Sequence, residues 1–234
     1  MALRLVVLDT ETTGLNARMG DRVVEIGCIE ILDRRPTENR FHVYLNPGRA
    51  SDPGAERVHG LTSEFLSDKP KFEEVGKAFL DYVRGAELII HNAPFDVEFL
   101  NQELELAGLG KLAEHCLSVT DTLSRARELH PGKKNTLDAL CERYGVDNSR
   151  RTLHGALLDA SLLAEVYLAM SRGQESLIVE TDSPPVMAGG SATFDASELT
   201  VLMATVDELA EHEKILVAID GESKGKTLWR LAAA

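Results

Sequence analysis

The feature that most constrains this sequence is an almost entirely apolar segment that stops at an acidic residue. Leu3–Leu8 consists mainly of leucine and valine, which favour strands, and Asp9 follows it at once. A strand that is apolar on both faces must be covered on both faces, so it belongs inside a sheet. The sequence therefore predicts a buried inner strand that ends in an acidic residue.

The rest of the first three quarters predicts strands first and helices later. Val23–Leu32 and Phe41–Leu45 are expected to form strands joined by a turn over Asp33–Asn39, and the short connections favour antiparallel pairing. The later elements are a helix at Phe72–Arg84, a strand at Glu87–Ile90, a helix from Pro94 to about Ala107, and helices at Thr122–Leu129, Thr136–Tyr144 and Gly155–Ser171. This order predicts an α/β fold, a mixed sheet flanked by helices.

The last quarter has a different composition. Residues 181–196 are rich in Asp, Ser, Pro, Gly and Ala, which is typical of a flexible linker. A helix at Ala196–His212, a strand at Lys214–Ile219 and a turn leading into Thr227–Leu231 are expected after it. A segment this short has little core of its own, so it should order only against a partner. The predicted domains are 1–180, a linker at 181–196, and a partner-binding segment at 197–234.

Charge and cysteine content exclude several classes of protein. The net charge of −13 argues against a broad basic face for DNA, and a DNA-acting protein this acidic would gain from being tethered to something that holds DNA. Three scattered cysteines form no metal-binding pair and fit a reduced, cytoplasmic setting. The N-terminus does not resemble a signal peptide, and no segment is suited to a membrane.

Acidic residues lie at the end of one predicted strand and at the start of one predicted helix, and they suggest metal chemistry. Asp9 and Glu11 are two apart on a strand, so both carboxylates point to one side, roughly 7 Å apart. Such a pair repels unless a cation lies between its members, and oxygen ligands suit Mg²⁺ and Mn²⁺. Asp96 falls in the first turn of the helix opened by Pro94, where the helix dipole favours an ionised carboxylate. Each feature alone also fits an ordinary strand end or helix start.

The third position combines a histidine with an aspartate. His154 and Asp159 are five residues apart, about 140° on one helix, so His154 is expected in the loop ahead of the helix that carries Asp159. Asp159 lies in a mostly apolar stretch, where an unpaired charge is costly and a metal is a natural partner. Four carboxylates can hold two divalent ions for a phosphodiester displacement, and a histidine can take a proton from water near neutral pH.

Three segments in this order resemble a known family. LDTETTG, HNAPFDVEFL and RTLHGALLDA look like the three exonuclease motifs of the DnaQ-like, or DEDDh, family, and residues 3–180 are similar to its proofreading ε-type members from bacterial DNA polymerase III. The resemblance implies an RNase H-like fold and two Mg²⁺ or Mn²⁺ ions. It assigns Asp9 to both ions, Glu11 and Asp159 to the nucleophile-side ion, Asp96 to the other ion, and the general-base role to His154.

The resemblance also implies residues that contact substrate. His59 matches a position near the phosphate of the terminal nucleotide, and Thr12, Leu15 and Phe95 match residues that line its pocket, beside Asp9, Glu11 and Asp159. Relatives often carry an acid at the position of Gly54, so one substrate contact is either missing here or supplied by Glu56. The basic residues around the third motif fit either contacts to backbone phosphates or solvated loop charges; they are Lys133, Lys134, Arg150 and Arg151.

The tail resembles partner-binding segments of the same proteins. The stretch containing Gln174, Ser176 and Leu177 is similar to a sliding-clamp-binding peptide without its aromatic anchor, and it fits equally a helix end running into the linker. The end of the chain, with Trp229, resembles the segment that docks on the α subunit of the replicative polymerase. The expected function is a proofreading 3′–5′ exonuclease acting on the DNA 3′ end. The alternatives are an RNA-trimming exoribonuclease and a non-catalytic scaffold that bridges polymerase and clamp.

Overall fold

The computed structural model describes residues 4–149, 151–171 and 204–223. The chain divides into two units, residues 1–179 and residues 180–234, and the described residues of each are treated by themselves. The predicted linker at 181–196 lies outside the described residues, and so do Gln174, Ser176, Leu177 and Trp229. No helix in the described part of the chain is long and apolar enough to cross a membrane.

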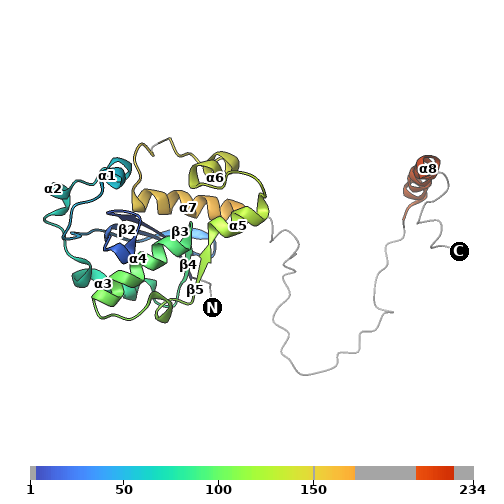
Figure 1. Cartoon of the computed structure of the whole chain (residues 1–234). Coiled ribbons are helices and arrows are strands. Elements are labelled where there is room, and N and C mark those ends of the chain that lie inside the picture. The colour runs from blue at the N-terminus through green and yellow to red at the C-terminus, as the bar shows by residue number, and fades with distance from the viewer. Residues whose placement is uncertain (1–3, 150, 172–203, 224–234) are drawn as a thin grey trace, which may run out of the picture. The chain divides into compact units, whose positions relative to one another are not determined.

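The first unit is built on the mixed sheet that the sequence predicts (Figure 1). Its strands are β1 (Arg4–Thr12), β2 (Val23–Leu32), β3 (Arg35–Tyr44), β4 (Glu87–Ile90) and β5 (Ser118–Asp121). Their order is β3-β2-β1-β4-β5; β1 pairs antiparallel with β2 and parallel with β4. The predicted inner strand therefore lies at the centre of the sheet.

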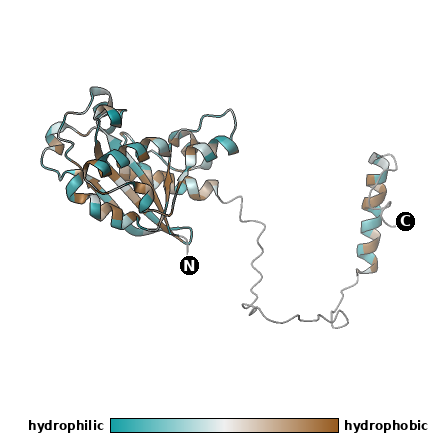
Figure 2. Ribbon diagram, turned by 60° about the horizontal axis from the view of Figure 1, so that its bottom comes forward, coloured by the Kyte–Doolittle hydropathy of each residue, from teal (hydrophilic) through white to brown (hydrophobic). Residues whose placement is uncertain are grey.

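Helices cover both faces of this sheet and form two separate cores. Val6 and Leu8 of β1 face one core together with α3 (Phe72–Val83) and α4 (Ala93–Leu106). Leu5 and Val7 face the other core, which α5 (Thr122–Leu129), α6 (Leu137–Tyr144) and α7 (Ala156–Met170) complete. Figure 2 shows the hydrophobic colouring concentrated on the strands between these layers. Period-two alternation along β1 thus supplies apolar side chains to both cores.

Three short elements, and the turn between β2 and β3, differ from the sequence prediction. Two short helices, α1 (Pro53–His59) and α2 (Ser63–Leu66), and the strand β5 were not predicted. The predicted turn over Asp33–Asn39 is wrong, because only Asp33 and Arg34 form the turn, both with positive φ, and β3 begins at Arg35. The polar start of β3 is typical of a loop, yet an edge strand tolerates such residues, including Pro36.

In the second unit the described residues form one helix, α8 (Val206–Ser223). The predicted strand at Lys214–Ile219 is therefore wrong. A reciprocal cap starts the helix: the Thr205 N–H donates to Glu208 Oε2 at 2.8 Å, and the Glu208 N–H donates to Thr205 Oγ1 at 3.3 Å. This local signal outweighs the β-favouring isoleucines and valine that alternate after Lys214.

Candidate active site

The site begins where the central strand ends. Asp9 and Glu11 lie two apart on β1 and share the face of the sheet that α7 covers. Both line a cleft of about 810 Å³, and the other three predicted residues, Asp96, His154 and Asp159, line the same cleft. Five side chains scattered over some 150 positions of the sequence are thus brought together.

Asp96 reaches the cleft from the opposite helical layer. It lies in the first turn of α4, as predicted, and is almost fully buried. Its Oδ1 accepts hydrogen bonds from the backbone N–H of Thr10 at 3.1 Å and from the Thr10 hydroxyl at 2.7 Å. Thr10 points away from Asp9 and Glu11, toward α4. The residue between the two acids of β1 therefore fixes the third acid.

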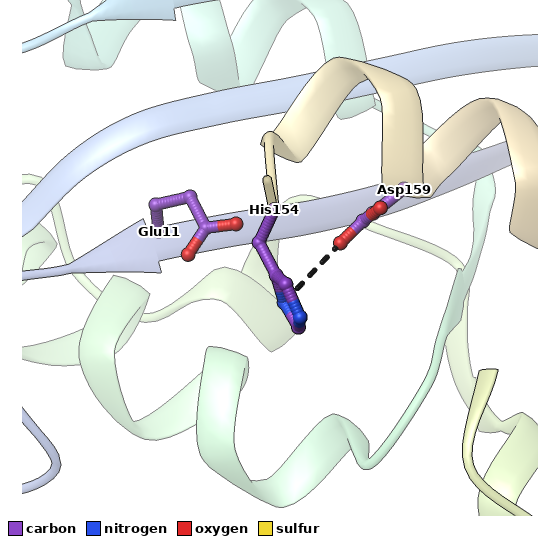
Figure 3. Close-up of side chains that lie close together, drawn as sticks. All are labelled: Glu11, His154 and Asp159. Carbon is purple, nitrogen blue, oxygen red and sulfur yellow. Dashed lines mark ion pairs between the residues drawn. The ribbon is translucent and has the colours of Figure 1, made fainter. Parts of the chain in front are cut away.

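Asp159 and His154 come from the start of α7 and the loop before it, as the spacing predicts (Figure 3). The backbone N–H of His154 donates to the backbone carbonyl of Val58 at 3.0 Å, and this bond joins the loop to α1. The Ala156 N–H at the helix N-terminus donates to Glu25 Oε2 of β2 at 3.1 Å. Glu25 is buried and was not singled out from the sequence, although an acid inside a mostly apolar strand is a usable signal; Glu30 is the second buried acid of β2.

The arrangement of ligand atoms fits a divalent cation. His154 Nδ1 lies 3.7 Å from Asp159 Oδ2, and Figure 3 draws this pair beside Glu11. One ligand atom each from Glu11, His154 and Asp159 lies within 4.8 Å of the others. Carboxylate oxygens are the ligands that Mg²⁺ and Mn²⁺ prefer, so Glu11 and Asp159 fit the ion that the sequence predicts, and the imidazole lies beside them.

Burial and mutual repulsion perturb the acids. The pKa of Asp9 lies well above its usual value, first because of burial and then because of the charges of Asp96, Glu11 and Asp159. Burial, together with Asp159 and Glu25, raises the pKa of Glu11 to about 8. Burial raises the pKa of Asp96 to about 7 against the opposing hydrogen bonds from Thr10. A bound cation would relieve this repulsion.

Asp159 has a partner that the sequence analysis did not expect. Arg151 Nε lies 2.6 Å from Asp159 Oδ1 and its Nη2 lies 2.8 Å from Oδ2. The Arg151 side chain is only 8% exposed, so the interpretation as a solvated loop charge is wrong for this residue. In the described part of the chain, Asp9, Glu11 and Asp96 have no ion pair with lysine or arginine. One of the four acids is thus neutralised, and the imidazole stays beside the cluster.

A smaller pocket of about 350 Å³ adjoins the acids. Its lining includes Thr12, Leu15, His59 and Phe95, the residues predicted for the terminal nucleotide. His59 is buried, its Nδ1 accepts from the Leu61 N–H at 3.0 Å, and burial lowers its pKa.

The loop before His59 gives this pocket an acid other than the expected one. Gly54 and Asp52 line the pocket, whereas Glu56 is not among its lining residues. Asp52 is therefore the acid of this loop that faces the pocket. Of the basic residues near the third motif, Lys133 and Arg151 line the larger cleft. Arg150 lies outside the described residues.

The fold and the cleft together define a class of protein, the metal-dependent exonucleases of RNase H-like fold. The model of the family described as Exonuclease matches residues 6–167. A solved structure of exonuclease X with 5′-overhanging duplex DNA is similar to this chain, with a TM-score of 0.58, 26% identity, and coverage of 73% of this chain and 92% of that chain. E. coli exonuclease I bound to single-stranded DNA shares the fold, with a TM-score of 0.64 at 19% identity over 74% of this chain and 41% of that one.

Curated relatives narrow the assignment. DNA polymerase III subunit epsilon of Escherichia coli K12 is 50% identical over 238 residues, covering 97% of each chain. The corresponding subunit of Pasteurella multocida is 48% identical over 235 residues, covering 97% of this chain and 93% of the relative. The chain therefore belongs to the exonuclease family, in its branch of DNA polymerase III epsilon subunits, and it is a 3′–5′ exonuclease.

Proposed function

We propose that this chain proofreads newly made DNA by hydrolysing the 3′-terminal phosphodiester and releasing a nucleoside 5′-monophosphate. The observation that carries the proposal is the convergence of four carboxylates and one imidazole on one cleft. Burial raises the pKa of Asp9, Glu11 and Asp96, and repulsion from neighbouring acids of the site adds to the shift for Asp9 and Glu11, which is a poor arrangement for stability and a good one for metal binding.

The residues that would hold the metal are Asp9, Glu11, Asp96 and Asp159. Two divalent ions, Mg²⁺ or Mn²⁺, suit four oxygen ligands of this kind. When bound, such ions lower the pKa of water and offset the negative charge that develops on the phosphate. The protein's own part is to hold the carboxylates rigidly, which Thr10 does for Asp96 through two hydrogen bonds.

His154 is the proposed general base. Its side chain is 47% exposed, so water and a phosphodiester can reach it, and its ring lies 3.7 Å from Asp159. Burial and the nearby Arg151 charge lower the pKa of His154, so the imidazole is neutral and able to accept a proton at neutral pH. The hydrogen bond from the backbone N–H of His154 to the Val58 carbonyl fixes the backbone from which the ring projects.

The smaller pocket is proposed to receive the terminal nucleotide. Leu15 at its rim is 85% exposed and Phe95 lies at its border with the acids, so both offer apolar surface to a base or sugar. A pocket beside the cleft accepts an unpaired end more easily than a paired one, because a frayed terminus avoids the cost of unpairing. His59 in the wall is proposed to lie near the terminal phosphate.

The tail is proposed to attach the enzyme to the replicative polymerase. A net charge of −13 disfavours strong DNA binding by this chain alone, so tethering through residues 197–234, with Trp229 as an anchor, would supply the substrate. Residues around Gln174, Ser176 and Leu177 are a weaker proposed contact with the sliding clamp. The three cysteines are free thiols, consistent with the proposed cytoplasmic location.

One set of assays tests this proposal. Matched DNA oligonucleotides with paired and mispaired 3′ ends, and an RNA of the same sequence, are incubated with the full chain, Mg²⁺ or Mn²⁺, or EDTA. We expect EDTA-sensitive release of 5′-mononucleotides, fastest from the mispaired DNA end. Faster cleavage of the RNA, or no cleavage by an enzyme that binds Mn²⁺, would contradict it. Co-purification with a replicative polymerase, with and without residues 181–234, tests the partner.

A further inference from the structure

We propose that the Arg151 guanidinium takes the place of a cation on Asp159 in the metal-free enzyme, so that loading the metal exchanges one cation for another. This inference rests on the proposed function, because it concerns Asp159 as a metal ligand. It assigns Arg151 a positioning role: the residue holds one acid and the imidazole in place before the site is loaded, and it must release the acid afterwards.

The contact between Arg151 and Asp159 occupies the whole carboxylate. Two parallel hydrogen bonds, Nε to Oδ1 at 2.6 Å and Nη2 to Oδ2 at 2.8 Å, use both oxygens of Asp159. The side chains are 8% and 4% exposed, so solvent screens this pair little. A divalent ion on the same oxygens would lie beside the guanidinium charge, so the two cations repel each other until the guanidinium moves.

A second carboxylate keeps Arg151 near the site. Asp138 lies in the first turn of α6, and both of its carboxylate oxygens accept from Arg151 Nη1, at 2.9 Å each. Asp138 is 57% exposed at the cleft wall and is not one of the four proposed ligands. When Arg151 leaves Asp159, this contact can hold the guanidinium at the cleft wall, so the exchange needs only a short movement of one side chain.

The same guanidinium also engages the proposed base. Arg151 Nη2 lies 3.1 Å from His154 Nδ1. Because a guanidinium only donates hydrogen bonds, Nδ1 acts as the acceptor, and its lone pair is used for this contact. One side chain thus restrains both a proposed ligand and the proposed base. Displacement from Asp159 therefore frees the imidazole at the same step.

The proposal predicts a specific change in cation binding. Arg151→Gln removes the competing cation, so it should bind Mn²⁺ at least about tenfold more tightly than the unaltered chain. In EDTA it should unfold at a lower temperature, because Asp159 loses its partner. In saturating Mn²⁺ the difference in unfolding temperature should largely disappear. Arg151→Lys keeps the charge but cannot form the two parallel bonds, so it should also bind Mn²⁺ more tightly.

The experiment is calorimetric titration of the full chain with Mn²⁺, together with thermal unfolding in EDTA and in Mn²⁺. The matched control is Lys133→Gln, which removes a cation that lines the same cleft, and it should leave both measurements close to those of the unaltered chain. Unchanged or weaker Mn²⁺ binding by both Arg151 variants, or equal tightening by Lys133→Gln, would overturn the inference. If the unaltered chain binds no Mn²⁺, the proposed function fails first.

Discussion

Gly27 of β2 lies directly against the backbone of Ala156, the first residue of α7. A Cβ on Gly27 would collide with the Ala156 carbonyl group and the Leu157 nitrogen, and backbone atoms cannot move aside as a flexible side chain can. The absence of a side chain at one strand position therefore sets how closely α7 approaches the sheet. That approach brings Asp159 near Glu11, since a ligand atom of each lies within 4.8 Å of the other.

Gly27→Ala should destabilise the enzyme and weaken metal binding together. Moving the start of α7 away from β2 should cost about 3 kcal/mol, at the upper end of the usual cost of overpacking. Urea unfolding with and without Mn²⁺ measures both effects. The matched control is Gly54→Ala, since a Cβ there meets no atom within 4 Å and should leave stability nearly unchanged. Equal stability of the two variants would refute this account of α7.

His154→Ala should abolish most of the activity without disturbing the fold. Loss of a general base typically lowers turnover by roughly 10²–10⁴-fold. The side chain is 47% exposed and packs little, so the unfolding temperature should stay close to that of the unaltered chain. Single-turnover cleavage of a mispaired DNA end measures the rate. Activity within a few-fold of normal would remove His154 from the mechanism.

The metal-free enzyme should lose stability as pH rises toward 8. The pKa values of Glu11, about 8, and Asp96, about 7, lie above those of unfolded chains, so the folded state holds more protons across this range. Stability is then fully present below about pH 4, the ordinary pKa range of these acids, and falls as pH rises through the folded values. Urea unfolding in EDTA, measured from about pH 5 to about pH 8, should show this decline in the free energy of unfolding.

Two comparisons isolate the acids in that experiment. Asp9→Asn removes one of the repelling charges, so its stability in EDTA should fall less steeply with pH. Saturating Mn²⁺ should flatten the profile of the unaltered chain, because a bound cation favours the ionised acids. An identical slope for Asp9→Asn would show that this cluster does not govern the pH dependence.

Glu103→Ala should destabilise the enzyme without removing a site residue. Glu103 of α4 is 2% exposed; its two oxygens accept from Arg22 Nε at 2.8 Å and Nη2 at 2.7 Å, and Oε1 also accepts from the Val23 N–H at 3.1 Å. Its loss leaves these donors without their acceptor and should cost about 3 kcal/mol in urea unfolding. The exposed neighbour Glu105 provides the control, and Glu105→Ala should change stability by less than about 0.5 kcal/mol.

The sequence predicted the parts of the fold that have strong local signals. The central strand was predicted from its continuous apolar run, and the helix that carries Asp96 was predicted from Pro94 in its first turn. The start of β3 was not predicted, because an edge strand buries little and shows a weak pattern. The second half of α8 was mistaken for a strand at Lys214–Ile219, because β-favouring residues alternate there, whereas the first half agrees with the helix predicted to end at His212.

For the candidate site, the sequence predicted which side chains converge but not which other residues pair with them. The five converging side chains were predicted from motif spacing and resemblance, and the structure gathers them on one cleft. Arg151 and Glu25 were not predicted to be partners of this site, because an ion pair or a helix-capping bond between distant residues has no periodic signature. Charged residues inside apolar segments are the remaining signal. They indicate that a charge is buried, but not which residue pairs with it.

The acids approach the end of β1 from opposite sides of the sheet, Asp96 from the layer of α4 and Asp159 from the layer of α7. Neither layer holds a complete set by itself. The proposed active site is therefore complete only after α7 has been synthesised and both helical layers have packed against the sheet. A chain that lacks α7 would hold Asp9, Glu11 and Asp96 without Asp159.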